Sequence, residues 1–129
     1  MEGSREDYIT YRLTKSEEAY ADAALLFENE RWNACVNRLY YSSYYTVSAL
    51  LYSHQITAHT HNGIKTKFFL SFIKTNMIER EYGKLYSRLF DWRNESDYAD
   101  FLDFDRNSVT PLLKSVSDFN TTLKMLIKH

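Results

Sequence analysis

The stretch NRLYYSSYYTVSALLY, residues 37–52, decides the fold of this 129-residue chain. No charged residue stands between Leu39 and Ser53, yet tyrosines occupy positions 40, 41, 44 and 45. Side chains three and four positions apart meet on one face of a helix. The stretch therefore predicts a helix that is buried on most sides and whose tyrosines carry polar tips.

A second stretch, RLFDWRNESDY at residues 88–98, has the pattern of the end of an amphipathic helix. The apolar stripe before it consists of Tyr82, Leu85, Tyr86 and Leu89. Four positions further along the same stripe stands Arg93, followed by Asn94 and Asp97. A charge at the end of a core stripe requires a reason, and these three residues are candidates for a site facing the tyrosines of the first stretch.

Composition limits the class of protein. A chain of 129 residues has the length of one domain, here residues 1–129, and can bury a core without disulfides or metals. Three glycines and one proline leave few helix breakers. Sixteen lysines and arginines nearly balance 17 aspartates and glutamates. This balance excludes a global basic field, so any contact with nucleic acid must be local.

The cysteine count and the terminal sequence indicate a compartment. Cys35 is the only cysteine, which excludes an intrachain disulfide and fits a reducing environment. The start of the chain, MEGSREDYITYRL, lacks the apolar core of a signal peptide. No stretch reaches the roughly 18 apolar residues of a membrane span. We expect a cytoplasmic protein with no membrane association.

Apolar periodicity predicts five helices, at about residues 7–28, 32–54, 63–75, from 79 onward, and from a cap at Asp105 or Ser108. The connector at residues 29–31 is short, and short connections join antiparallel neighbours. The last helix has the cleanest stripe, formed by Val109, Leu112, Val116, Phe119, Leu123 and Leu126. The predicted fold is all-α: an antiparallel up-and-down four-helix bundle with an additional short helix.

Several segments together resemble a known family. They occur in order from Tyr11 to Leu126: YRL in the first helix, RWNACVNRLYYSSYYTVSALL, a HTHNG loop, LYSRLFDWRNESDY and a closing amphipathic helix. This combination resembles the HEPN superfamily, and more narrowly the small prokaryotic stand-alone HEPN proteins. The resemblance implies a helical bundle that is commonly homodimeric. It also implies roles in nucleotide binding, in RNA cleavage, or in toxin–antitoxin pairing with a minimal nucleotidyltransferase.

The ribonuclease signature of that family is an arginine followed, after four to six intervening positions, by a histidine. Here the matching arginine is Arg93, and the positions for the histidine hold Tyr98, Ala99 and Asp100. The histidine is missing. Histidine is the side chain whose pKa suits proton transfer near neutrality, whereas tyrosine titrates near 10. The departure favours a protein that binds its ligand over one that cleaves it.

Each candidate feature also has a purely structural interpretation. Arg93 and Asp97 stand four apart and could form an ion pair at a helix end in place of a ligand contact. The tyrosines supply large buried area and could serve the core or an interface instead of stacking on bases. His59 and His61 have no third ligand at recognisable spacing, so we expect no metal site.

Two functions from different classes follow. The first is a homodimer, without cofactor, that binds a nucleotide, an RNA or a protein partner through Arg93, Asn94, Asp97, Tyr98, Tyr40, Tyr41 and Tyr44. The second is a ribonuclease toxin in which Arg93 stabilises the phosphate charge and Tyr98 or a loop histidine replaces the missing base. A third alternative is a structural partner that masks another chain. We favour the first, as one half of a toxin–antitoxin pair.

Overall fold

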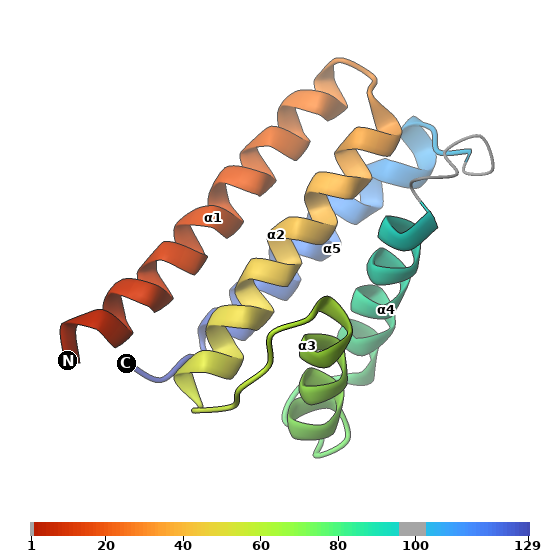
Figure 1. The fold of residues 1–129 in the computed structure, drawn as a ribbon. Helices are drawn as coiled ribbons and strands as arrows, with labels where there is room; N and C mark the ends of the chain where they lie inside the picture. The colour runs from red at the N-terminus through yellow and green to blue at the C-terminus, as the bar shows by residue number, and fades with distance from the viewer. Residues whose placement is uncertain (1, 96–102) are drawn as a thin grey trace.

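The structure is a computed structural model that describes residues 2–95 and 103–129. In these two ranges it contains five α-helices, one π-helical turn and no strand (Figure 1). The elements are α1 (Glu2–Glu28), α2 (Trp32–Ser53), α3 (His61–Phe68), η1 (Phe69–Ile73), α4 (Arg80–Glu95) and α5 (Arg106–Lys124). The predicted all-α bundle is confirmed, with α3 and η1 as the additional short element.

Helix α2 lies at the centre of the bundle and packs against α1, α3, α4 and α5. Ser16 on α1 donates to the carbonyl of Ser42 at the middle of α2, and the two helices run in opposite directions (Figure 1). Asn120 on α5 donates to the same Ser42, and the amide of Lys128 donates to Ser53 at the end of α2. Helices α2 and α5 therefore run in the same direction, as alternate members of an up-and-down bundle do.

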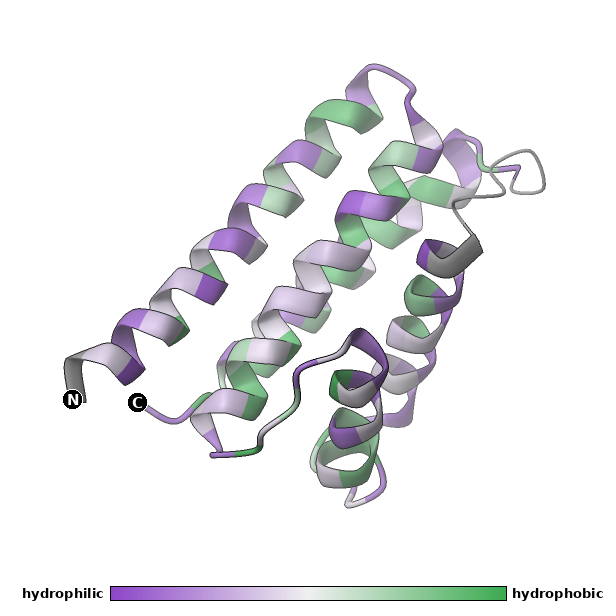
Figure 2. Cartoon of the chain, viewed as in Figure 1, coloured by the Kyte–Doolittle hydropathy of each residue, from purple (hydrophilic) through white to green (hydrophobic). Residues whose placement is uncertain are grey.

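The centre of α2 is polar but not charged, which accounts for its composition. Ser16 Oγ donates to the Ser42 carbonyl at 2.7 Å and lies 2.7 Å from Thr46 Oγ1. Ser42 Oγ donates in return to the Ser16 carbonyl at 2.9 Å. Buried hydroxyls require such partners, and their small size lets α1 approach α2 closely. In Figure 2 the middle of α2 is correspondingly pale, between hydrophilic and hydrophobic.

The third helix begins earlier than the sequence pattern predicts. We expected it at Gly63, but α3 starts at His61, with Thr60 as its N-cap. Thr60 Oγ1 accepts the Gly63 amide at 2.8 Å, as threonine does at a helix start. The HTHN residues thus divide between a loop and a helix, and His61 gains a fixed position in the first turn. At its other end α3 continues into η1, so the expected helix to Thr75 becomes a π-helical turn.

Gly83 permits the close packing of α4 against η1. A Cβ atom at this position would lie 3.2 Å from Ile73 Cγ2 and 3.2 Å from Phe69 Cε1. These distances are shorter than ordinary carbon contacts of about 3.5 to 4.0 Å. The absence of a side chain at Gly83 therefore sets how near the additional short element comes to the bundle.

Helix α5 closes the bundle. Asp105 is its N-cap: the carboxylate accepts the Ser108 amide at 2.8 Å, and Ser108 Oγ accepts the Asp105 amide, which completes a capping box. Phe119 is fully buried, and its ring is stacked on Tyr86 at 5.9 Å between centroids. Cys35 is buried too, and burial raises the pKa of its thiol to about 11. The thiol is therefore protonated and packs as a small core residue.

Candidate functional site

Four tyrosines of α2, Tyr40, Tyr41, Tyr44 and Tyr45, form what we call the tyrosine cluster. Tyr40 and Tyr44 are buried, whereas Tyr41 and Tyr45 are half-buried. Each ring contacts its neighbours: Tyr40 stacks with Tyr44 at 5.9 Å and meets Tyr41 edge-on at 5.2 Å. The buried rings therefore belong to the core, whereas the half-buried rings leave surface on which a base could stack.

Arg93 lies at the end of α4 against this cluster. Its Nε–H donates to the Tyr41 hydroxyl at 3.3 Å. Its guanidinium carbon is 5.8 Å from the ring centroid of Tyr40 and 5.9 Å from that of Tyr41. Such cation–π contacts hold a charged group in place without neutralising it. The structure therefore brings together Arg93, Tyr40 and Tyr41, which the sequence analysis grouped.

His61 joins the same site from the first turn of α3, where the sequence analysis considered a loop histidine only as the substitute base of the ribonuclease alternative. Its Nδ1 lies 2.7 Å from the Tyr40 hydroxyl. Its ring stacks on Tyr44, with centroids 4.2 Å apart and planes 18° from parallel. Burial, and then the positive charge of Arg93, lower the pKa of His61. The imidazole is therefore neutral at pH 7.

The hydrogen bond between Tyr40 and His61 depends on which nitrogen of the imidazole carries the proton. Burial is the largest cause that raises the Tyr40 pKa, so its hydroxyl keeps its proton. When that hydroxyl donates to Nδ1, the neutral imidazole carries its own proton on Nε2, which is then a donor. In the opposite tautomer Nδ1–H donates to Tyr40 and Nε2 is an acceptor. The first tautomer suits anion binding, and the second suits proton abstraction.

Further cations surround the cluster. The guanidinium carbon of Arg38 is 4.7 Å from the Tyr41 ring centroid, and Lys65 Nζ is 4.5 Å from that of Phe90. The guanidinium of Arg12 is 5.6 Å from the Tyr45 ring centroid. Within the part of the chain that the structure describes, no carboxylate lies within ion-pair distance of Arg12, Arg38 or Lys65. The surface around the tyrosine cluster is locally basic although the whole chain is not.

This arrangement has the chemistry of an anion site. It combines an aromatic surface with a guanidinium, a neutral imidazole and further positive charges at its rim. A guanidinium offers donors in a fixed planar fork that matches phosphate. Aromatic rings beside it offer faces for stacking a base. A phosphate-bearing ligand with an aromatic ring satisfies both features.

The structure supplies no metal centre in residues 2–95 and 103–129, where no group of three or more His, Cys, Asp or Glu could hold an ion. His59 and His61, which share the H-T-H motif, differ in their surroundings: His61 contacts the tyrosine cluster and His59 lines a pocket elsewhere. None of the helices in these ranges is long and apolar enough to cross a membrane.

Three of the expected site residues are not placed. Asp97 and Tyr98 lie outside the described residues, and so does the side chain of Asn94, whose backbone is in the last turn of α4. The ion pair considered between Arg93 and Asp97 is likewise outside them. Their part in the site stays a prediction.

The residues that the sequence analysis missed divide into two kinds. Arg38 stands three positions before Tyr41 on the same helix, so helical spacing alone could have found it. His61 and Arg12 come from other helices and reach the cluster only through tertiary packing, whereas Lys65 contacts Phe90, the ring of which lies against Tyr40. No spacing in the sequence relates His61 to Arg93.

Comparisons with known proteins complete the description of the chain. The HEPN domain family matches residues 9–126. A UPF0332 protein from Thermotoga maritima is 34% identical over 124 residues, which are 96% of this chain and 94% of that protein. A protein from Methanocaldococcus jannaschii that is named "Putative toxin" is 30% identical over 116 residues, 89% of this chain and 79% of its own length. A UPF0332 protein from Archaeoglobus fulgidus is 26% identical over 113 residues, 88% and 90% of the two chains.

Proposed function

The chain belongs to the HEPN domain family, and from that premise we propose that it is a binding protein for a nucleotide or an RNA, held through Arg93 and the tyrosine cluster. It acts as a homodimer in the cytoplasm and as the toxin member of a toxin–antitoxin pair. A minimal nucleotidyltransferase is the partner. The chain binds its ligand without cleaving it, because Tyr98 occupies the position at which the family signature has its histidine.

One observation carries the proposal: the guanidinium of Arg93 rests on Tyr40 and Tyr41 beside the neutral imidazole of His61. Such a guanidinium is held in place before the ligand arrives, so little rotamer entropy is lost on binding. The Tyr41 and Tyr45 rings are half-buried and leave aromatic surface for a base. Arg38 adds positive charge beside Tyr41, and Arg12 adds it beside Tyr45.

The names of the relatives support the toxin assignment. Two proteins of Methanocaldococcus jannaschii that match the chain carry the name "Putative toxin". The family resemblance supports the pairing with a nucleotidyltransferase and the homodimer. Co-purification with the product of an adjacent nucleotidyltransferase gene tests the pairing directly.

The binding proposal is tested with a fluorescently labelled short RNA and a labelled adenine nucleotide, by anisotropy at fixed ionic strength. We expect Arg93→Ala to weaken binding at least tenfold, because a charge-assisted contact contributes about 1.5 to 3 kcal/mol. The matched control is Arg88→Ala, an exposed arginine on the same helix. Equal affinity of the Arg93→Ala and Arg88→Ala proteins would reduce Arg93 to a structural role.

A second candidate function is cleavage of RNA, and the position of His61 favours it. The imidazole lies beside Arg93, so one group could take a proton from a 2′-hydroxyl while the other stabilises the phosphate charge. Cleavage without metal that is lost in both Arg93→Ala and His61→Asn would establish this function. We expect no such cleavage, because Tyr98 stands where the family signature has its histidine.

A further inference from the structure

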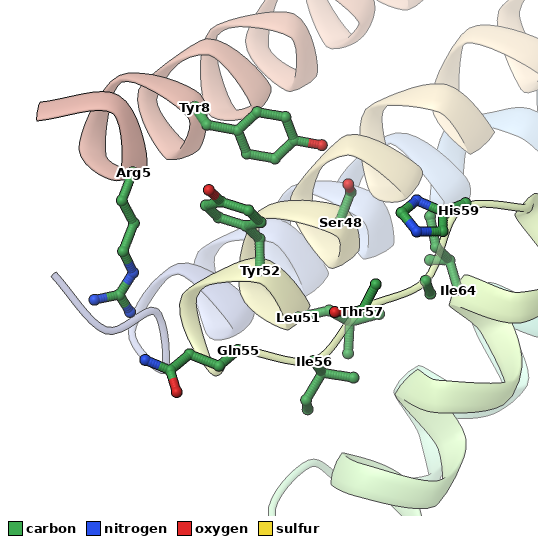
Figure 3. A pocket seen from close by; sticks show the side chains of 11 residues that line it. Arg5, Tyr8, Ser48, Leu51, Tyr52, Gln55, Ile56, Thr57, His59 and Ile64 are labelled. Carbon is green, nitrogen blue, oxygen red and sulfur yellow. The ribbon is translucent and has the colours of Figure 1, made fainter. Parts of the chain in front are cut away.

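A pocket of about 520 Å³ opens between the beginning of α1, the last turns of α2 and the non-helical segment at residues 55–59 (Figure 3). Its size lies within the range of small-molecule sites, about 300 to 1,000 Å³. None of its lining residues belongs to the tyrosine cluster, and neither Arg93 nor His61 lines it. It is therefore a second cavity that the proposed function does not use.

The lining of the pocket is partly apolar and partly aromatic. Leu51, Ile56 and Ile64 contribute apolar side chains to its lining. Tyr52 stands on the side, with its ring centroid 4.3 Å from that of Tyr8 and the planes tilted by 43°. Tyr52 is 39% exposed, a large fraction for an aromatic ring that borders a cavity. This combination favours a planar, mostly apolar ligand.

The charge of the lining is one-sided. Apart from His59, Arg5 is the only basic residue that lines the pocket. The lining contains no aspartate or glutamate. The terminal nitrogen of Arg5 donates to the Ser53 carbonyl, which anchors the side chain at the rim. Its Nε is buried and has no hydrogen-bond partner in the described structure. Because Nε is closed to solvent, an anion in the pocket would be bound by the other donors of the guanidinium, which has five in all.

We propose that this pocket binds a small aromatic anion, a planar ring bearing a carboxylate or sulfonate. The ring lies on Leu51 and Ile56 beside Tyr52, and the anionic group lies at Arg5. The amide of Gln55 also lines the pocket and can orient the polar end. The site is independent of the phosphate site at Arg93, so the two can be occupied separately.

The test uses two fluorescent probes that share their rings and differ by one sulfonate group. The first, 8-anilinonaphthalene-1-sulfonate, carries a sulfonate, and the second, N-phenyl-1-naphthylamine, has the same rings without it. We expect the anionic probe to bind the full chain saturably, at one site per chain. The uncharged probe is expected to bind more weakly, because it makes no contact with Arg5.

Three variants assign the site. Arg5→Gln should weaken the anionic probe about tenfold or more and leave the uncharged probe unchanged, since only a charge-assisted contact is lost. Thr57→Phe, on the non-helical segment, should fill the pocket and abolish both. Arg80→Gln, an exposed arginine at the start of α4, is the matched control and should change neither.

The outcomes separate a defined pocket site from adsorption on exposed apolar surface. Unsaturable binding, or binding that Arg5→Gln and Thr57→Phe leave intact, would overturn the proposal in favour of adsorption. Arg93→Ala should leave both probes unaffected, so a failure of the phosphate site does not count for or against this one. Unfolding curves of each variant confirm that lost binding is not lost structure.

Discussion

His61 links the pH to the stability of the fold. Burial and Arg93 lower its pKa below the ordinary 6.5. Between the two values the unfolded chain binds more protons than the folded one, so stability is present above pH 6.5 and falls as the pH drops through the folded pKa. We predict that the free energy of unfolding in urea decreases from about pH 7 to about pH 5.

The control for this prediction is the His61→Asn protein, which cannot take up the proton. Its stability should fall less over the same pH interval. An equal decrease in both proteins would contradict the assignment of the effect to His61. The shifts of Asp105 and Tyr40 belong to lower and higher pH and do not interfere, because the Asp105 pKa is lowered and the Tyr40 pKa is raised.

The tautomer of His61 distinguishes the two candidate functions directly. We predict that ¹⁵N NMR at about pH 7.5 finds the proton on Nε2, the tautomer in which the Tyr40 hydroxyl donates to Nδ1. Tyr40→Phe removes this donor and should shift the equilibrium toward Nδ1–H. A proton on Nδ1 in the unaltered protein would support the cleavage function instead.

At the level of single residues, the contacts that could be predicted from the sequence were those that helical spacing determines. Arg93 continues the stripe of α4 by one turn, so its approach to the tyrosines of α2 followed from the pattern. The partner of Tyr40 did not follow, because His61 depends on the path of a loop and on the cap at Thr60. A loop path is decided by contacts that no local pattern contains.

At the level of elements, α5 supplies the aromatic centre of the core. Phe119 is fully buried between Phe68, Tyr82 and Tyr86, with ring centroids 5.8 to 5.9 Å away. We predict that Phe119→Ala lowers the free energy of unfolding by about 3 to 5 kcal/mol, since it removes a ring and leaves a cavity. Leu25→Ala, at a side chain that is 60% exposed, should change it by no more than about 0.5 kcal/mol.

The N-cap of α5 can be tested separately from the core. We predict that Asp105→Ala lowers the melting temperature by about 3 to 6 °C, because the Ser108 amide loses its acceptor. The loss should be nearly absent in Asp105→Asn, which keeps an oxygen at the cap. Equal destabilisation by the two substitutions, in parallel thermal melts, would show that charge and not capping is responsible.

The number and type of the helices followed from the sequence because apolar periodicity is a local property. The start of α3 did not, since the polar residues of HTHN resemble a loop until Thr60 is seen to cap a helix. The π-helical turn at η1 was also missed. It lies within the helix expected at residues 63–75 but has a different hydrogen-bond pattern, and it packs where Gly83 lets α4 approach.

At the level of the whole molecule, the surface around the tyrosine cluster is the candidate dimer interface. The side chains of Tyr41 and Tyr45 are only half-buried there, and Tyr52, further along the same helix, is exposed. We predict a homodimer with two-fold symmetry and with α2 or α4 near the axis. Light scattering at micromolar concentration should give about twice the chain mass of 15.4 kDa.

Tyr45→Arg should shift the dimer toward the monomer, because it places a charge where two like surfaces meet. Tyr11→Arg is the matched control, since Tyr11 is 55% exposed on α1. A monomer at every concentration would contradict the dimer. It would leave the phosphate-site proposal intact, because each chain carries its own Arg93.

The central position of α2 has a consequence for the genetics of this protein. The helix that presents the tyrosines is also the one against which α1, α3, α4 and α5 pack, so it should be among the last segments to exchange amide hydrogen for deuterium. The site then keeps its shape for as long as the chain is folded at all. Temperature-sensitive substitutions in the core should therefore reduce the number of folded molecules, while each folded molecule keeps its binding activity. Their phenotype should follow protein abundance, with an abrupt temperature threshold.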